Sequence, residues 1–86
     1  MAVVHIPTQW RADVGADRLE VGGATLRQVI AALEARAPGI ADRVMADGRL
    51  RPELAISING AIAERGLIEP VPDGAEIYLI PAIGGG

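Results

Sequence analysis

The chain has 86 residues, half of them hydrophobic, and a formal net charge of −3, which together predict one small globular domain with a single core. Because the chain has no cysteine, it has no disulfide, thiolate metal site or iron–sulfur cluster. Its single histidine, His5, has no second histidine with which to build a histidine metal site, and a His-based triad would depend on this one residue. Scattered arginines and only two aromatic residues, Trp10 and Tyr78, argue against a nucleic-acid-binding surface, and no apolar run is long enough to span a membrane.

Two strands are expected first. Residues 2–6 form a short apolar run rich in β-branched side chains, and Pro7 closes it. Residues 8–16 are polar and contain a glycine, so they are expected to form a turn or loop. Residues 17–21 alternate polar and apolar side chains, which predicts a half-buried strand that ends at Gly22-Gly23. The two strands are expected to pair as an antiparallel hairpin.

A helix follows, beginning at Thr25. Thr25 and Gln28 have the spacing of a capping box, which would satisfy exposed N–H groups at the helix start. Pro38-Gly39 supplies the end. Apolar residues recur at helical spacing along one stripe, namely Leu26, Val29, Ile30, Leu33 and Ala37.

The connection after the helix is less regular. Residues 40–45 are expected to add one or two helical turns, with Ile40 and Val44 facing the core. Asp47-Gly48 indicates a turn, and residues 49–52 lead out of it.

The last third of the chain predicts the rest of a sheet. In residues 54–58 the large side chains alternate with small ones, so Leu54, Ile56 and Ile58 are expected to face inward. Asn59-Gly60 is a strong tight-turn signal, and residues 61–64 are expected to form a short returning strand or an irregular connection. Pro72-Asp73-Gly74 makes another turn before the final strand, residues 76–81.

This order of elements predicts an α+β domain of the β-grasp (ubiquitin-like) type, with one main helix on a mixed sheet of four to five strands. In that fold the first and last strands lie side by side and parallel. The expected division is a domain over residues 1–82 and a flexible glycine tail over residues 83–86.

A face for docking a partner protein is expected on the final strand. If Ile77 and Leu79 pack under the helix, Tyr78 and Ile80 stand on the opposite face of the sheet. By the same alternation Ala55 and Ser57 lie on that side, and together the four make it less polar than a solvated face usually is. Scattered surface residues, or an alternation wrong by one residue, would explain the same pattern.

The chain stops on Gly84-Gly85-Gly86, directly after the final strand. Glycine has no Cβ, so such a tail could carry the Gly86 carboxylate down a narrow channel in a partner. A frayed terminus or an engineered scar would also end this way. Inside the domain no residues suggest an enzyme, because the acids are dispersed and Gly22-Gly23 lacks the residues that complete a phosphate loop.

All eight basic side chains are arginines, and the chain has no lysine. Without lysine, a protein whose C-terminal carboxyl group is activated would avoid the reaction of that group with ε-amines of its own chain. Codon bias in a GC-rich genome, which the abundant Ala, Gly and Arg also suggest, gives the same composition.

The chain carries several short motifs, namely Ile6-Pro7-Thr8 with Arg11, Ala24-Thr25-Leu26, Gly48-Arg49-Leu50-Arg51, Ile58-Asn59-Gly60, Pro72-Asp73-Gly74 and the whole ending from Leu79 to Gly86. In this order and spacing the motifs resemble the MoaD/ThiS family of sulfur-carrier proteins, and within it the CysO type. One departure is Gly84, where these relatives usually have alanine before the final Gly-Gly.

The resemblance implies a carrier and not an enzyme. An E1-like adenylyltransferase/sulfurtransferase would adenylate the Gly86 carboxylate with ATP, and sulfur would then replace AMP to give a thiocarboxylate. Gly84 and Gly85 would thread into the partner, and a sulfur-accepting biosynthetic enzyme, for cysteine or another sulfur-containing metabolite, would receive the tail.

The alternatives are the small subunit of molybdopterin synthase, a ubiquitin-like protein modifier, and a binding module whose tail has no role. No bound cofactor, metal, nucleic acid or membrane is expected. Because the N-terminal residues do not look like a signal peptide, the expected location is cytoplasmic.

Overall fold

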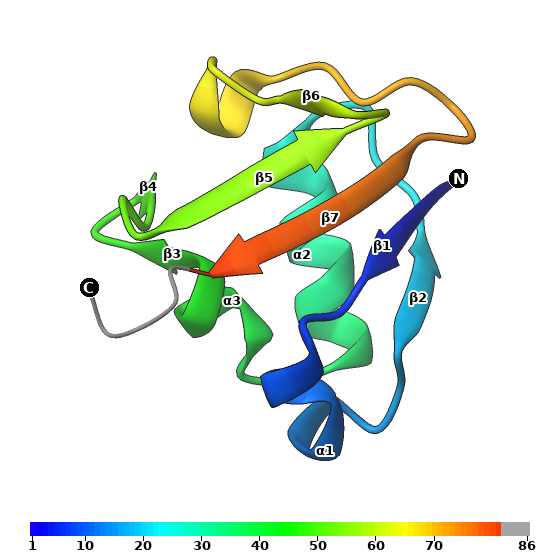
Figure 1. The fold of residues 1–86 in the computed structure, drawn as a ribbon. Coiled ribbons are helices and arrows are strands. Elements are labelled where there is room, and N and C mark those ends of the chain that lie inside the picture. Colours follow the sequence, from blue (N-terminus) through cyan, green and yellow to red (C-terminus); the bar gives the residue numbers. More distant parts are fainter. Residues whose placement is uncertain (82–86) are drawn as a thin grey trace.

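A sheet and one long helix form the two layers of the domain. The computed structural model describes residues 1–81, and within them five strands form a mixed sheet in the order β2-β1-β7-β5-β6, with helix α2 (Leu26–Arg36) packed across one face (Figure 1). The strands are β1 (Ala2–His5), β2 (Arg18–Val21), β5 (Leu54–Ile58), β6 (Ala61–Ile62) and β7 (Glu76–Pro81).

The final strand lies in the middle of this sheet. β7 pairs in parallel with β1, with Val4 opposite Ile77, and antiparallel with β5, with Ile56 opposite Leu79. β1 also pairs antiparallel with β2, as the expected hairpin. The parallel pairing of first and last strands, predicted from the element order, is therefore confirmed.

Helix α2 begins as the sequence predicts, with one difference in its cap. The Thr25 hydroxyl accepts a hydrogen bond from the Gln28 backbone N–H at 3.4 Å, while Gln28 Oε1 accepts one from the Ala24 N–H at 2.7 Å, one residue before the cap. Gly23, at φ +140°, precedes this cap, and a Cβ there would lie 2.8 Å from the Val29 nitrogen. Glycine is therefore required where β2 passes into the helix.

A short helix, α3 (Ile40–Val44), follows α2 and also packs on the core through its two end residues. The Glu34 carboxylate of α2 accepts hydrogen bonds from the backbone N–H groups of Gly39 and Ala41, at the start of α3. These bonds stabilise the charged carboxylate and so lower the pKa of Glu34. Glu34 thus joins the two helices, a role that the stripe of α2 did not indicate.

The prediction of a turn or loop at residues 8–16 is wrong in part. It contains a 3₁₀ turn, η1 (Thr8–Trp10), and one turn of helix, α1 (Arg11–Val14). Trp10 is only 9% exposed, so burial of its large ring favours a compact helical path. Gly15, in the left-handed region at φ +81°, ends the turn.

Two tight turns have the same backbone form. Asn59-Gly60 joins β5 to β6, and Asp47-Gly48 joins β3 (Met45–Ala46) to β4 (Arg49–Leu50), a separate ribbon that the sequence did not predict. All four turn residues have positive φ, as two-residue hairpins of this type require. The remaining 3₁₀ turn is η2 (Gly66–Ile68).

The core fills the space between α2 and the inner face of the sheet. The predicted helix stripe and the predicted inward residues of β5 are all buried. The fully buried large side chains are Ile6, Leu26, Leu33, Ile40, Ile77, Val4, Val29 and Val44. Over residues 1–81, no helix has both the length and the apolar character needed to cross a membrane.

Candidate docking face and tail base

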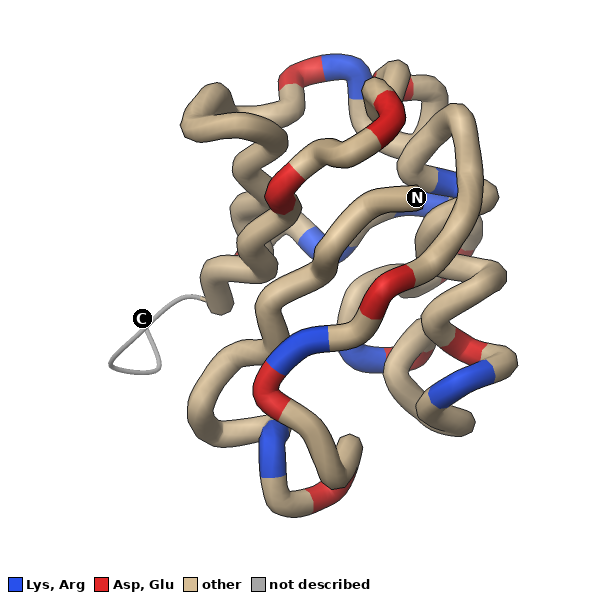
Figure 2. The backbone as a smooth tube through the Cα atoms, turned by 90° about the vertical axis from the view of Figure 1, so that its right-hand side faces the viewer, with Lys and Arg blue, Asp and Glu red and all other residues tan. Residues whose placement is uncertain are grey.

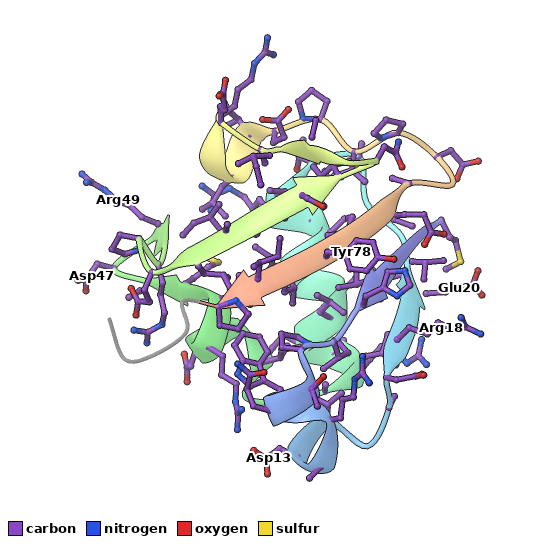
Figure 3. The ribbon with its side chains drawn as sticks, in the orientation of Figure 1. Asp13, Arg18, Glu20, Asp47, Arg49 and Tyr78 are labelled. Atoms are coloured by element: carbon purple, nitrogen blue, oxygen red, sulfur yellow. The ribbon has the colours of Figure 1, made fainter. Side chains whose placement is uncertain are left out.

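The face of the sheet opposite α2 carries the residues proposed for docking. Tyr78 is 47% exposed and Ile80 44%, while their neighbours Ile77 and Leu79 are buried under the helix. Figure 3 shows the Tyr78 side chain on the outer face of β7. The alternation predicted for this strand therefore has the correct register.

The two β5 residues lie on the same face but contribute unequally. Ala55 is paired with Ile80 and is half-buried, and Ser57 is paired with Tyr78 but is only 8% exposed. Ser57 is therefore covered by its larger neighbours and offers little surface to a partner.

The sequence missed two residues of this face. His5 is paired with Tyr78 across the parallel β1–β7 contact, and Ile62, which is 55% exposed, is paired with Ser57 across the β5–β6 hairpin. The register of the two-residue Asn59-Gly60 turn would have placed Ile62 there. His5 could be placed only once the β1–β7 register was known. We call Tyr78, Ile80, Ala55, His5 and Ile62 the outer-face patch.

An aromatic stack lies at the centre of the outer-face patch. The rings of His5 and Tyr78 are nearly parallel, with centroids 4.1 Å apart and an interplanar angle of 5°. The His5 Nε2 atom lies 2.6 Å from Glu76 Oε1, within hydrogen-bonding distance. The histidine is thus held between a carboxylate and a ring, and the outer face of Tyr78 is left to solvent.

Toward β2 the apolar character of this face ends. An open depression of about 510 Å³ beside His5 and Glu76 is bordered by Arg18, Glu20 and Arg36. Arg18 and Glu20 extend from β2 at the edge of the sheet (Figure 3). The outer-face patch therefore has an apolar centre with charged residues along one side, as protein-binding surfaces commonly do.

A second depression lies at the end of β7, where residues 82–86 begin. It measures about 350 Å³, and we call it the tail base. Its lining residues are Trp10, Asp42, Arg43, Arg51, Glu53, Leu54 and Pro81.

Both arginines of the tail base are held by neighbours. The Arg43 guanidinium lies 5.6 Å from the centroid of the Trp10 ring and forms an ion pair with Asp13. Arg51 Nε donates a hydrogen bond of 2.8 Å to the Asp42 carbonyl oxygen. Elsewhere along the described chain, acidic and basic residues are interspersed (Figure 2).

The predicted sulfur-bearing end, Gly84, Gly85 and Gly86, lies outside the described residues and remains a prediction. Within residues 1–81, no three His, Asp or Glu side chains come together in a group that could hold a metal ion. The outer-face patch and the tail base both adjoin β7.

Known proteins resemble the chain over its whole length. The ThiS family model matches residues 4–86. The sulfur carrier protein CysO of Mycobacterium tuberculosis is 34% identical over 89 residues, covering 96% of each chain. A chain of the Amycolatopsis orientalis BexX/CysO complex superposes with a TM-score of 0.94 at 30% identity, over the full length of both chains. SAMP1 from Haloferax volcanii superposes with a TM-score of 0.79 at 28% identity, over 99% of this chain and 98% of SAMP1. The predicted β-grasp fold and the predicted family are confirmed, and the chain belongs to the ThiS family.

Proposed function

We propose that the chain is a sulfur carrier that bears sulfur as a thiocarboxylate on Gly86. The observation that carries the proposal is the similarity to CysO, a sulfur carrier protein, over 96% of each chain, together with a ThiS family match that runs to residue 86. A carboxylate is a poor electrophile, so an E1-like enzyme would first join it to AMP from ATP, and a sulfur donor would then displace AMP. Because this chemistry consumes ATP, we place it in the cytoplasm.

The geometry of β7 supports this role. β7 is paired with β1 from Glu76 to Tyr78 and with β5 from Ile77 to Pro81, and residues 82–86 follow directly. Such an anchored strand fixes the point from which the tail enters a partner, while glycine suits the confined path. The domain is then a co-substrate, and its partners perform the catalysis.

We further propose that the outer-face patch docks these partners. It combines an exposed tyrosine with two exposed isoleucines on one sheet, and Tyr78 and Ile80 lie on the strand that leads into the tail. One structural relative was solved as a complex, named BexX/CysO, and we propose by analogy that an acceptor enzyme binds this chain.

The proposal is tested by intact-mass measurement after incubation with an E1-like enzyme, ATP and a sulfur source. We expect a mass increase that corresponds to sulfur in place of one oxygen, and no such increase in the variant that lacks Gly84, Gly85 and Gly86. Unchanged mass in the wild-type chain, with an enzyme active on another carrier, contradicts the proposal.

A protein-modifier function is the second candidate, because SAMP1, named as a small archaeal modifier protein, is 26–28% identical to the chain. The same reaction distinguishes the two when other proteins are added. A carrier gives thiocarboxylate only, whereas a modifier also gives products in which Gly86 is linked to lysine amines of those proteins.

A further inference from the structure

One edge of the main sheet offers a strand for further pairing. β2 is the outermost strand on its side of the sheet, and within residues 1–81 only β1 pairs with it (Figure 1). The open depression of about 510 Å³ runs beside this strand, where Arg18, Leu19 and Glu20 border it. The edge strand on the other side, β6, has only two residues. Because an edge strand presents N–H and C=O groups to which another strand can bind, β2 is the longer edge available for such pairing.

The backbone of β2 presents Arg18 and Glu20 at this edge. The Ile6 N–H donates to the Asp17 carbonyl oxygen at 2.9 Å, in register with the β1–β2 ladder. In an antiparallel ladder, Asp17 and every second residue after it therefore direct their backbone groups toward β1, and the residues between them direct theirs outward. The Glu20 carbonyl oxygen does point outward, since it accepts a hydrogen bond of 3.1 Å from Arg36 Nη1. A carbonyl oxygen has two lone pairs, so it can accept a second hydrogen bond there.

The charges of β2 are complementary to those of a second β2 in a single register. When two copies pair antiparallel, residues with outward backbone groups lie opposite each other, and in β2 these residues are Arg18 and Glu20. Arg18 opposite Arg18, or Glu20 opposite Glu20, places like charges directly across the ladder, which is destabilising. Arg18 opposite Glu20 places unlike charges together in both directions, with Leu19 opposite Leu19 at the centre. The order of charges along β2 therefore favours this register over its neighbours.

We propose that β2 is a dimerisation edge, at which a second copy of this chain pairs antiparallel about Leu19, with Arg18 of each copy opposite Glu20 of the other. The two five-stranded sheets then form one continuous sheet. The two-fold axis is perpendicular to this sheet, so both outer-face patches lie on the same side and stay accessible to partners. Leu19, which is half-buried in the single domain, covers its remaining apolar surface against the second Leu19. This inference does not depend on the chemistry proposed for Gly86.

Sedimentation velocity of the full-length chain at increasing concentration tests the dimer. Only four residues of each copy pair along the edge. Such a small interface is expected to give a weak, reversible dimer with a dissociation constant on the order of 0.1–1 mM. A chain that remains monomeric at about 1 mM overturns the proposal.

The charge-exchange variants Arg18→Glu and Glu20→Arg test the register. Each variant alone places like charges opposite each other in both pairs, so its dissociation constant should rise at least about tenfold. Mixed in equal amounts, the two variants are complementary again and should form a heterodimer with about the wild-type affinity. The double variant, which carries both exchanges in one chain, should also dimerise like the wild type.

The matched control is Arg27→Glu, on the exposed side of α2, which changes the net charge as Arg18→Glu does. It should dimerise like the wild type. Thermal melts establish that each variant is folded. Equal dissociation constants for the wild type and both single variants, or a mixture that stays as monomeric as its folded components, overturn the proposed pairing.

Discussion

At the scale of single residues, the central feature is the stack of His5 on Tyr78. The parallel rings and the contact between His5 and Glu76 restrict the tyrosine to one orientation while 47% of its surface stays exposed. A side chain that is already ordered loses less conformational entropy when a partner covers it. Tyrosine is also among the residues that contribute most to binding at protein interfaces. Tyr78 is therefore the strongest candidate for an anchor on the outer-face patch.

We expect Tyr78→Thr to raise the KM of the activating enzyme for the carrier about tenfold, with little change in kcat, because a central interface tyrosine contributes roughly 1–2 kcal/mol to binding. Threonine keeps a β-branched side chain in the strand. Steady-state activation kinetics measure this. The control Ile68→Thr alters a residue that is 70% exposed, in η2, and should leave KM unchanged. Equal KM values for Tyr78→Thr and wild type, with both folded, would show that the patch does not dock the enzyme.

At the scale of secondary-structure elements, the sequence predicted the helices, strands and turns whose signal lies in neighbouring residues of the chain. The stripe of α2, the alternation of β5 and the Asn59-Gly60 turn each involve neighbours along the chain, and all three are confirmed. The helical turns at residues 8–14 and the β3–β4 ribbon were missed, because each is too short to show a period and depends on tertiary contacts such as the burial of Trp10.

The candidate site was predictable to a similar extent. Alternation along one strand correctly placed Tyr78 and Ile80 on the outer face. It could not show that Ser57 is covered, since its exposure depends on the size of side chains in other strands. His5 required the β1–β7 register, which joins the two ends of the chain. The tail base combines residues of η1, α3, β5 and β7 with the connection before β5, and no local pattern indicates it.

The link between α2 and α3 leads to a pH prediction. Hydrogen bonds from Gly39 and Ala41 lower the pKa of Glu34 below its ordinary value of 4.5. The charged carboxylate therefore stabilises the folded state at pH values above the unfolded pKa, and this stabilisation is lost as pH falls through the folded pKa. We expect Glu34→Gln to lower the melting temperature at about pH 7, and the difference from wild type to shrink toward about pH 3.

Thermal melts followed by circular dichroism across this pH range measure the effect. The control is Glu64→Gln, which removes the same charge from an exposed connection. A difference between wild type and Glu34→Gln that stays constant with pH would show that the hydrogen bonds to the charged carboxylate do not stabilise the folded state.

At the scale of the whole molecule, stability and presentation of the tail depend on the same strand. β7 contributes Ile77 and Leu79 to the core, and Ala75, the residue just before the strand, is also buried. The other face of β7 carries Tyr78 and Ile80 of the outer-face patch. An 86-residue domain has one small core and therefore little stability to lose. Damage to the core beneath β7 should therefore abolish docking and activation together.

We expect Ile77→Ala to destabilise the domain by about 2–5 kcal/mol, because it leaves a cavity at a fully buried position. For a domain of this size, this lowers the melting temperature by roughly 10–30 °C. Ile68→Ala, at an exposed position, should stay within about 0.5 kcal/mol of wild type. Chemical denaturation gives both values, and similar stabilities for the two variants would contradict the packing described here.

The central position of β7 also has a consequence for biosynthesis. Until residues 76–81 have left the ribosome, β1 and β5 lack the strand that joins them in the sheet. Because β1 pairs with β7 more than 70 residues further along the chain, the domain has many long-range contacts and folds only after β7 has been synthesised. An interrupted translation product that stops before β7 would stay unfolded and be open to proteolysis. Folding thus selects chains that have been synthesised at least through β7, the strand that immediately precedes the tail.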